Sequence, residues 1–414
     1  MDPAQEGQLS LNTCKLICGQ YGSLMPRPNI AIIGKETIPF LPTGISHNNI
    51  ECPPNVCPLL DQAVAIMIGT INKHHPRYSA TGSYWEGPWT EKVNNHKLVI
   101  DFHVTENEEY LTLLSDESYN LLIVTSPGET KATINARTFF GARHALETLS
   151  QLIDFDEENN SMQVVSKASI QDSPAFPYRG FIIDTSRNYI SIKDIKRTLD
   201  AMSYNKLNTF HWHIVDSHSF PLVINSLPDM ADFGAYSPSQ VYTPSDVKDI
   251  VQYARVRGIR VLPEIDAPAH AGHGWQWSEE QGLGKLVLCL DARPWTAYCV
   301  EPPCGQMNLA NEKLYEYLGI VYNEVIDMFS PVDLFHYGGD EVNLNCWNTS
   351  VEMTDWMTAN NFGLDDKAYY KQWSVFQEKA RNLVINANNG KNIKGVIWTS
   401  HLTEKGRVDL YLNK

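Results

Sequence analysis

The sequence predicts an α/β protein in which a small α+β domain precedes a TIM (β/α)8-type barrel. Three observations lead to this prediction. From residue 176 onward, apolar runs alternate with helical segments, which is typical of βα units with buried parallel strands. Polar side chains follow the ends of these runs, where barrel enzymes carry their active sites. Between about 61 and 155, in contrast, strand-like runs surround a single helical segment.

The length of 414 residues is enough for two domains of ordinary size. The region from 20 to 60 is rich in Pro, Gly and Asn and is typical of connecting loops. The middle region has strand-like runs at 97–104, 119–126 and 132–136 and a helix at 137–153. We therefore expect a Cys-containing segment over 1–60, a noncatalytic α/β domain over 61–170 and a catalytic barrel domain over 176–414.

The barrel region contains about five strand-like runs, at 180–186, 207–216, 259–268, 333–339 and 393–400. The helical segments between them are 192–206, 244–258, 314–329 and 368–388. A doubly wound sheet also fits this alternation, but the polar residues at the strand ends favour the barrel. We expect the barrel to be incomplete, with unprotected edges at its first and last strands. Residues 1–414 expressed alone are then expected to aggregate or to be inactive.

The composition excludes several classes of partner. A net charge of −15 argues against nucleic acid and anionic membranes, whereas neutral ligands such as sugars are compatible with it. No apolar run approaches the roughly 20 residues of a membrane span. The first twelve residues have neither the basic nor the apolar region of a signal peptide.

Eight cysteines in local groups predict disulfides and an oxidising compartment. A zinc site is the weaker interpretation, because there is no CxxC pair. We expect a secreted or lysosomal protein whose true N-terminus is missing from this chain. Glycosylation sequons at Asn159 and Asn348 add little, because such tripeptides often arise by chance.

The stretch "DLFHYGGDEV" places two acids, Asp340 and Glu341, directly after two glycines. On a continuing strand, adjacent side chains would point to opposite faces. Glycines permit backbone angles that other residues avoid, so the strand is expected to end there and both acids to face one pocket. Two carboxylates beside one sugar suit glycoside hydrolysis.

A second stretch, "HWHIVDSH", places His211 and His213 on one face of a strand, with Asp216 beyond them. An HxH pair is also found in barrel metallohydrolases, which are the main rival class. No later His on a strand-like segment completes a metal site, so we favour histidines hydrogen-bonded inside the barrel. We expect no metal and no cofactor.

Further candidates follow other strands. In "LPEIDAPAH", His270 follows Glu264 and Asp266, and a His near an acid can tune its pKa and relay protons. Arg179 precedes the first barrel strand, and Asp184 and Arg187 follow it; an Arg can hold sugar hydroxyls or brace the barrel rim. Aromatic walls for sugar rings are also available, at Trp295, Trp347 and Trp398.

Together, the motifs "RGFIIDTSRNY", "HWHIVDSHSFP", "LPEIDAPAH" and "HYGGDEV" resemble glycoside hydrolase family 20, the β-N-acetylhexosaminidases, in order and approximate spacing. The segments "WTAYCVEPPCGQMN" and "SLNTCKLICGQYGSLMPRPN" are similar to the insect chitinolytic members. The resemblance covers nearly the whole chain. It implies an exo-acting, retaining enzyme that releases terminal N-acetylglucosamine from chitin oligosaccharides or N-glycans.

The resemblance also implies roles for individual residues. The substrate's own acetamido oxygen is the nucleophile, so Asp340 orients the acetamido group and Glu341 is the general acid and base. Asp216 and His270 support Glu341. Substrate contacts are implied for Arg179, Trp295, Val300, Glu301 and Trp398.

We predict disulfides Cys299–Cys304 and Cys289–Cys346, with Cys14 and Cys18 bonded to the Cys52 and Cys57 pair. The expected partners are N-acetylglucosamine-containing oligosaccharides, and a homodimer is left open. The alternatives are an inactive, truncated sugar-binding fragment and a barrel metallohydrolase. Turnover of a chromogenic N-acetylglucosaminide and metal analysis would separate these three.

Overall fold

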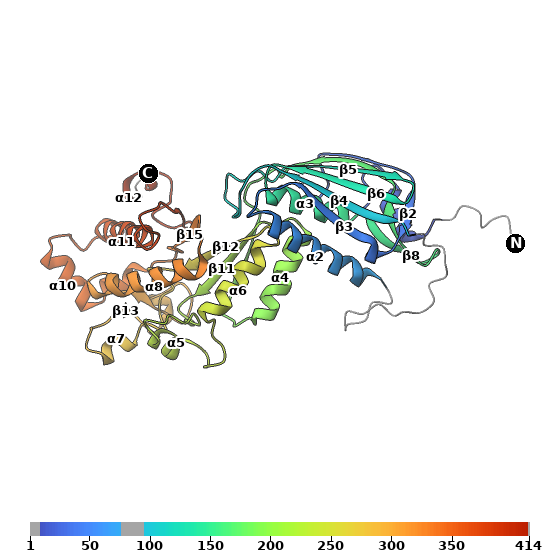
Figure 1. Cartoon of the computed structure of the whole chain (residues 1–414). Coiled ribbons are helices and arrows are strands. Elements are labelled where there is room, and N and C mark those ends of the chain that lie inside the picture. Colours follow the sequence, from blue (N-terminus) through green and yellow to red (C-terminus); the bar gives the residue numbers. More distant parts are fainter. Residues whose placement is uncertain (1–8, 76–94, 413–414) are drawn as a thin grey trace. The chain divides into compact units, whose positions relative to one another are not determined.

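The computed structural model describes residues 9–75 and 95–412 (Figure 1). The chain divides into two compact units. The first comprises 1–179, 198–208 and 254–260, and the second comprises 180–197, 209–253 and 261–414. The N-terminal segment is thus part of the first unit, and two short stretches of the expected barrel region belong to that unit as well.

The first unit is built on a mixed six-stranded sheet in the order β1-β9-β5-β6-β4-β3. Neighbouring strands pair antiparallel from β1 to β6, and β6, β4 and β3 pair in parallel. A smaller sheet has the order β2-β8-β7. The strands are β1 (Ile30–Ile33), β2 (Thr37–Phe40), β3 (Ile45–Glu51), β4 (Lys97–Val104), β5 (Tyr119–Ser126), β6 (Glu129–Ala136), β7 (Ile153–Asp156), β8 (Ser161–Val165) and β9 (Lys167–Asp172).

Helices α2 (Cys57–His74) and α3 (Phe139–Ser150) lie against one face of the six-stranded sheet (Figure 1). Thr138 caps α3, because its side chain accepts from two backbone N–H groups of the first turn. Every residue of α3 is buried. The short helices α1 (Leu11–Ile17) and η2 (Pro42–Gly44) complete the unit.

Two predictions for this unit are wrong. The region 20–60 was expected to consist of loops, but it forms β1, β2, β3 and the start of α2. β3, with the sequence "ISHNNIE", is an edge strand with no fully buried side chain, so its polar composition hides it. Helix α2 was not predicted. Parts of the expected segments, residues 1–8 and 76–94, lie outside the described residues.

The second unit contains a five-stranded sheet in the order β10-β11-β12-β15-β16. The pairs β10–β11, β12–β15 and β15–β16 are parallel. β11 and β12 are buried throughout, as expected for strands covered on both faces. In the described part of the chain, β10 and β16 are the edges of this sheet. Its strands are β10 (Gly180–Asp184), β11 (Thr209–Val215), β12 (Arg260–Ile265), β15 (Leu334–His336) and β16 (Lys394–Val396).

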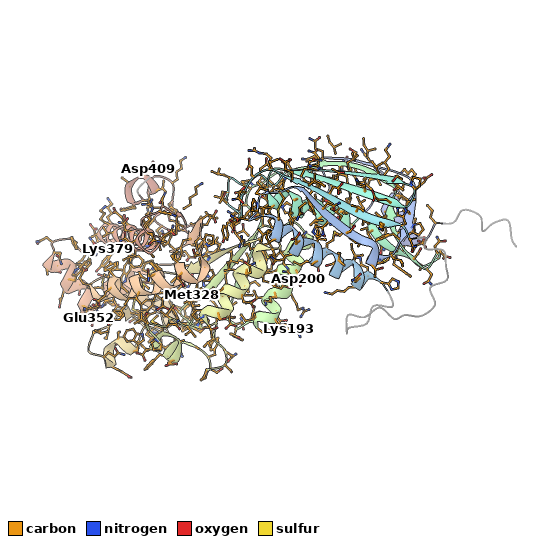
Figure 2. The ribbon with its side chains drawn as sticks, viewed as in Figure 1. Lys193, Asp200, Met328, Glu352, Lys379 and Asp409 are labelled. Carbon is orange, nitrogen blue, oxygen red and sulfur yellow. A yellow bond between two sulfur atoms is a disulfide. The ribbon has the colours of Figure 1, made fainter. Side chains whose placement is uncertain are left out.

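Helices separate these strands in the sequence, as predicted: α4 (Ile192–Tyr204), α6 (Pro244–Arg255), α8 (Lys313–Phe329) and α11 (Asp366–Ala387). In α8, Met328 is buried, whereas Glu352 of α10 (Val351–Ala359) is exposed (Figure 2). No described helix is long and apolar enough to cross a membrane. Shorter elements lie in the connections: α5 (Asp229–Gly234), α7 (Trp277–Glu280), β13 (Val287–Leu288), η3 (Trp295–Ala297), β14 (Gln306–Met307), α9 (Leu344–Asn348), α10 (Val351–Ala359) and α12 (Val408–Tyr411).

All eight cysteines form disulfides. The predicted bridges Cys299–Cys304 and Cys289–Cys346 are confirmed. The prediction that Cys14 and Cys18 bond to Cys52 and Cys57 is wrong. Cys14 bonds to Cys18, and Cys52 bonds to Cys57. Cys14 and Cys18 are four residues apart on α1 and its C-cap, so one helical turn already places their Cα atoms 4.9 Å apart.

Candidate active site

The backbone after β15 turns sharply, because Gly338 and Gly339 adopt left-handed conformations with φ of 62° and 79°. A Cβ on Gly338 would lie 1.7 Å from an Asp266 oxygen, and a Cβ on Gly339 would lie 2.6 Å from the Gln377 side-chain nitrogen. Glu341 is also left-handed, with φ of 53°, a strained conformation of the kind that clusters at functional sites. The strand alternation therefore stops, and Asp340 and Glu341 line the same pocket.

This pocket lies in the second unit and has a volume of about 240 Å³. Most of its lining comes from segments at or near the C-terminal ends of the parallel strands, where a barrel-type sheet carries its functional residues. The lining residues are Ile182, Asp184, Arg187, His213, Asp266, His270, Glu301, Asp340, Glu341 and Trp398.

His270 connects the acid pair to the interior. Its Nε2 lies 3.1 Å from Glu341 Oε2 and 3.9 Å from Asp340 Oδ1, and its Nδ1 lies 3.3 Å from Asp216 Oδ2. Burial alone would lower the pKa of His270, but the charge of Asp266 and the hydrogen bonds with Asp216 and Glu341 raise it well above the ordinary value. The predicted candidates Asp216, His270, Asp340 and Glu341 are thus brought together.

The two adjacent acids differ electrostatically. Burial raises the pKa of Asp340, although the nearby His270 cation opposes the shift. The hydrogen bond from His270 lowers the pKa of Glu341, against the effect of its partial burial. Asp340 Oδ1 is a buried oxygen without a hydrogen-bond partner among the described residues, so it is free to accept one from a ligand.

Asp266 lies beneath the turn and stabilises it. Its Oδ1 accepts the Gly339 N–H at 2.9 Å. Burial raises the pKa of Asp266 to about 8, although the His270 cation opposes this. Asp216 and Glu341 add hydrogen bonds that hold His270 protonated.

The structure does not bring Arg179 to this pocket, and Arg187 lies there instead. Arg179 precedes the first residue of β10, and its guanidinium is bound to Glu117 and to backbone carbonyls of the first unit. Arg187 follows the last residue of the strand. Its guanidinium lies 2.7 Å from Asp184 Oδ2 and 2.9 Å from Asp216 Oδ2, and it also pairs with Glu301.

The predicted substrate-contact residues Val300 and Glu301 lie on the short loop that Cys299–Cys304 closes. Val300 is 55% exposed, and Glu301 is directed at Arg187. Trp295, in η3 just before this loop, is 37% exposed and does not line the pocket. Trp347 is fully buried and donates its N–H to the Met307 carbonyl at 2.9 Å, so it belongs to the core.

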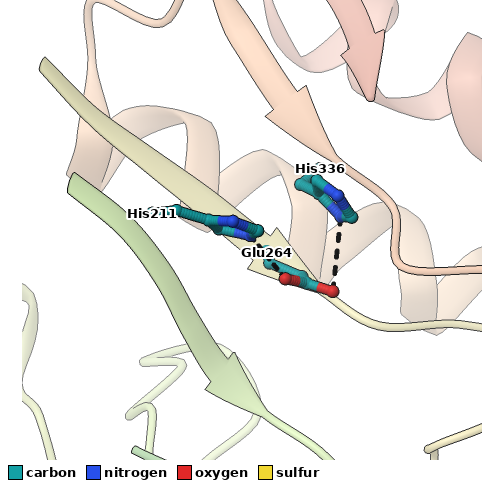
Figure 3. A group of neighbouring side chains, drawn as sticks. All are labelled: His211, Glu264 and His336. Carbon is teal, nitrogen blue, oxygen red and sulfur yellow. Dashed lines mark hydrogen bonds and ion pairs between the residues drawn. The ribbon is translucent and has the colours of Figure 1, made fainter. Parts of the chain in front are cut away.

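Trp398 lines the pocket, and its indole N–H donates to Glu264 Oε1 at 2.8 Å. Glu264 is completely buried, and three imidazoles also face it: His211 Nε2 at 2.5 Å, His213 Nδ1 at 3.2 Å and His336 Nδ1 at 3.3 Å. Figure 3 shows two of these rings, His211 and His336, each directed at a different Glu264 oxygen.

The expectation that no later strand histidine completes a candidate metal site is wrong, because His336 of β15 forms such a group with His211 and Glu264. Ligand atoms of His211, Glu264 and His336 lie within 4.8 Å of one another, close enough to bind one metal ion. Protein donors already occupy two of these ligand atoms: the Trp398 N–H binds Glu264, and the Gly338 N–H binds His336 Nδ1 at 3.0 Å. We interpret the group as a hydrogen-bonded hub beneath the pocket.

Two family descriptions match the chain. Residues 176–412 match the catalytic domain of glycosyl hydrolase family 20, and residues 24–152 match a domain described as beta-acetyl hexosaminidase like. The chain is 24% identical to a solved exo beta-N-acetylglucosaminidase of that family from Vibrio harveyi, with a TM-score of 0.70 over 95% of this chain and 56% of the other. This likeness shows the fold.

Relatives with higher identity include a chitooligosaccharidolytic beta-N-acetylglucosaminidase from Bombyx mori, 41% identical over 99% of this chain and 66% of the relative. An enzyme of the same description from Ostrinia furnacalis is 42% identical over 100% of this chain and 67% of the relative. The human beta-hexosaminidase subunit beta is 32% identical over 93% of this chain and 65% of the relative. The chain thus spans about two thirds of the length of these relatives. It belongs to glycosyl hydrolase family 20.

Proposed function

We propose that the protein is an exo-acting, retaining β-N-acetylhexosaminidase that removes terminal N-acetylglucosamine from chitin oligosaccharides or N-glycans. The observation that carries the proposal is the convergence of the adjacent acids Asp340 and Glu341 on one pocket. The description of the insect relatives as chitooligosaccharidolytic enzymes supports chitin oligosaccharides as the substrate class. Four disulfides support a secreted or lysosomal location, because disulfides persist in oxidising compartments.

The first step is an attack from within the substrate, the route used by this family. The unpartnered Asp340 Oδ1 accepts the acetamido N–H of the bound sugar. The acetamido carbonyl oxygen then forms a bond to the anomeric carbon, and the glycosidic C–O bond breaks. The resulting oxazolinium ion carries a positive charge that the Asp340 carboxylate stabilises. Because the nucleophile is already part of the bound sugar, much of the entropic barrier is removed.

The leaving oxygen needs a proton, and the His270–Glu341 pair carries one. In the resting protein this proton lies on His270, because the pKa of His270 is raised and that of Glu341 is lowered. Glu341 accepts it across the 3.1 Å contact and passes it to the departing oxygen. In the second step Glu341 removes a proton from water, which opens the oxazolinium and retains the anomeric configuration.

The other pocket residues bind the sugar. We assign Arg187, rather than Arg179, to the hydroxyls of the non-reducing sugar, because its guanidinium lies on the pocket wall. Trp398 provides an apolar wall for the acetamido group. Glu301 and Val300, on the disulfide-closed loop, are positioned for the next sugar of an oligosaccharide.

The test is hydrolysis of a 4-nitrophenyl N-acetyl-β-glucosaminide, with the 4-nitrophenyl β-glucoside as the matched control. The proposal predicts turnover of the first substrate only, because the second has no acetamido nucleophile. The first product observed by NMR should be the β-anomer. Equal turnover of both substrates, or an α-anomeric first product, would contradict the proposal.

The metallohydrolase alternative is tested in the same assay. Turnover should survive dialysis against a chelator, because the Glu264 carboxylate is held by protein donors. A loss that added zinc restores would favour the alternative. Soluble, folded protein that binds N-acetylglucosamine without turning over either substrate would favour the inactive sugar-binding fragment.

A further inference from the structure

The hydrogen-bonded group behind Glu341 does not end at Asp216. His213 Nε2 lies 3.1 Å from Asp216 Oδ2, the same oxygen that faces His270 Nδ1 at 3.3 Å. On its other side, His213 Nδ1 lies 3.2 Å from Glu264 Oε2. Carboxylates and imidazoles therefore alternate over five side chains, from Glu341 at the pocket to Glu264 in the interior.

The inner members of this chain are buried. The exposed fractions are 0% for Glu264, 2% for Asp216 and 4% for His213. Buried charges need partners, and their interactions are screened less than those of surface charges. Burial opposes a charge on His213, but its hydrogen bonds to Asp216 and Glu264 raise its pKa well above the ordinary value. His213 is therefore an imidazolium that donates to both carboxylates.

We propose that Glu264 and His213 are positioning residues for the general acid Glu341. Glu264 fixes His213 as a donor on two sides, and His213 keeps Asp216 ionised and directed at His270. The proposal rests on the proposed function, since it assumes that the His270–Glu341 pair delivers the proton to the leaving group.

Glu264 also connects this chain to the pocket wall. Its Oε1 accepts the Trp398 N–H at 2.8 Å, while Oε2 faces His213. One buried carboxylate thus positions both the aromatic wall and the inner end of the hydrogen-bonded chain. This arrangement couples the position of the acetamido group to the position of the acid.

The sign of the expected pH effect follows from the charges. Removing the negative charge of Glu264 makes the site more positive, so the His270–Glu341 pair should release its proton at lower pH. The charged or titratable groups that face His213 and His270 are Arg187 after β10, Asp216 after β11, Glu264 and Asp266 at β12, and Asp340 and Glu341 after β15.

His211 offers a matched comparison with His213. Both lie on β11, both are buried, and both face Glu264 Oε2, at 2.5 and 3.2 Å. In the described residues, His211 makes no hydrogen bond or ion pair with Asp216. Burial lowers the pKa of His211, although Glu264 opposes this, so His211 is neutral where His213 is charged.

The experiment compares His213→Gln, Glu264→Gln and His211→Gln with the unmodified full chain, by the pH dependence of kcat/KM and by melting temperature. We expect Glu264→Gln, which removes a negative charge, to move the basic limb of the kcat/KM profile to lower pH by about one unit. His213→Gln, which removes the positive charge of the imidazolium, should move that limb to higher pH, and both variants should reduce kcat more than they change KM. His211→Gln should lower the melting temperature by a similar amount without moving that limb. If the basic limb of the kcat/KM profile lies at the same pH in all three variants, Glu264 and His213 are merely structural.

A second measurement does not depend on turnover. NMR of the ¹⁵N-histidine-labelled chain should show His213 protonated on both ring nitrogens at pH 7, with the proton lost at lower pH in Glu264→Gln than in the unmodified chain. If the unmodified chain hydrolyses no N-acetylhexosaminide, the proposed function fails, and the NMR result still decides the state of His213. If the chain is active but His213 is neutral at pH 7, the positioning role is overturned.

Discussion

Asp340 and Glu341 are adjacent in the chain and line one pocket, yet their pKa values shift in opposite directions. Burial dominates at Asp340 and raises its pKa, whereas the His270 hydrogen bond dominates at Glu341 and lowers its pKa. If the pKa alone decided the roles, the general acid would be Asp340, because its carboxyl group keeps a proton to higher pH than that of Glu341. The roles follow instead from contacts, because only Glu341 forms a short contact with a protonated histidine.

This difference predicts a bell-shaped pH profile of kcat/KM. The reaction needs Asp340 as an anion and one proton on the His270–Glu341 pair. Because burial raises the pKa of Asp340, the acid limb should lie above 3.8, and because the pKa of His270 is raised, the basic limb should lie above 6.5. An acid limb at or below 3.8 would contradict the role of Asp340 as the ionised group.

Glu341→Gln should reduce hydrolysis of a chitin disaccharide by more than about 100-fold, since an alkoxide leaving group needs a proton. A dinitrophenyl glycoside, whose leaving group needs little protonation, should lose much less. Asp340→Asn is the matched control, because it removes charge stabilisation of the oxazolinium and should impair both substrates by similar factors. Equal losses on both substrates in Glu341→Gln would remove Glu341 from the role of acid.

The stability of the Asp266→Asn variant should rise relative to that of the unmodified protein as the pH increases from about 4 to about 8. Burial raises the pKa of Asp266 from 3.8 to about 8, so in this interval the unfolded chain loses the proton while the folded chain keeps it. The contribution of Asp266 to stability is full below 3.8 and falls with rising pH. The amide does not ionise and retains an acceptor for the Gly339 N–H. We expect the difference in the free energy of unfolding between the two proteins to change by up to about 5 kcal/mol over this interval, at about 1.4 kcal/mol per pH unit, measured by unfolding at several pH values; a pH-independent difference would contradict it.

Gly338→Ala should destabilise the protein more than Gly390→Ala does. Both glycines are left-handed, with φ of 62° and 76°, so both substitutions cost about 1–2 kcal/mol for the backbone conformation. A Cβ at Gly390 meets nothing within 4 Å, whereas one at Gly338 would overlap Asp266. The overlap should add about 1–3 kcal/mol and lower activity as well. Equal melting temperatures would show that the turn can relax.

The two disulfides of the second unit should differ in effect when each is replaced by a serine pair. Chain entropy predicts a loss of about 2 kcal/mol for Cys299–Cys304 and about 4 kcal/mol for Cys289–Cys346, because the closed loops differ in length. Val300 and Glu301 lie directly between Cys299 and Cys304, so the smaller bridge constrains them most closely. Its removal should therefore raise KM for a chitin oligosaccharide several-fold while changing KM for an aryl monosaccharide little. A parallel rise of KM for both substrates would contradict a role of this loop in binding the second sugar.

Much of the fold follows from sequence patterns. The predicted strands 97–104 and 119–126 coincide with β4 and β5, and the order of strands and helices after residue 180 is confirmed. β3 was missed because an edge strand needs no apolar stripe, as its sequence "ISHNNIE" shows. Edge position depends on which strands pair over long range, and local composition does not contain that information.

Part of the site also follows from position along the strands. The rule that functional groups follow the C-terminal ends of barrel strands selects Arg187, whereas transfer by motif similarity selected Arg179. Histidines hydrogen-bonded inside the barrel were predicted at His211 and His213, but their shared partner Glu264 was not. Nor was His336, because its place depends on the register that sets it opposite Glu264 on neighbouring strands. Likewise, only three-dimensional contacts show that Asp216 is shared by His213 and His270.

The arrangement of the disulfides has a consequence for biosynthesis. Cys14–Cys18, Cys52–Cys57 and Cys299–Cys304 join residues only four or five positions apart, so each can close as soon as its own short segment enters an oxidising compartment. Cys289–Cys346 spans 57 positions and encloses α8 and β15, so it must wait until both have been synthesised. During oxidative folding, the local bridges remove most cysteines from competition before this long-range one forms.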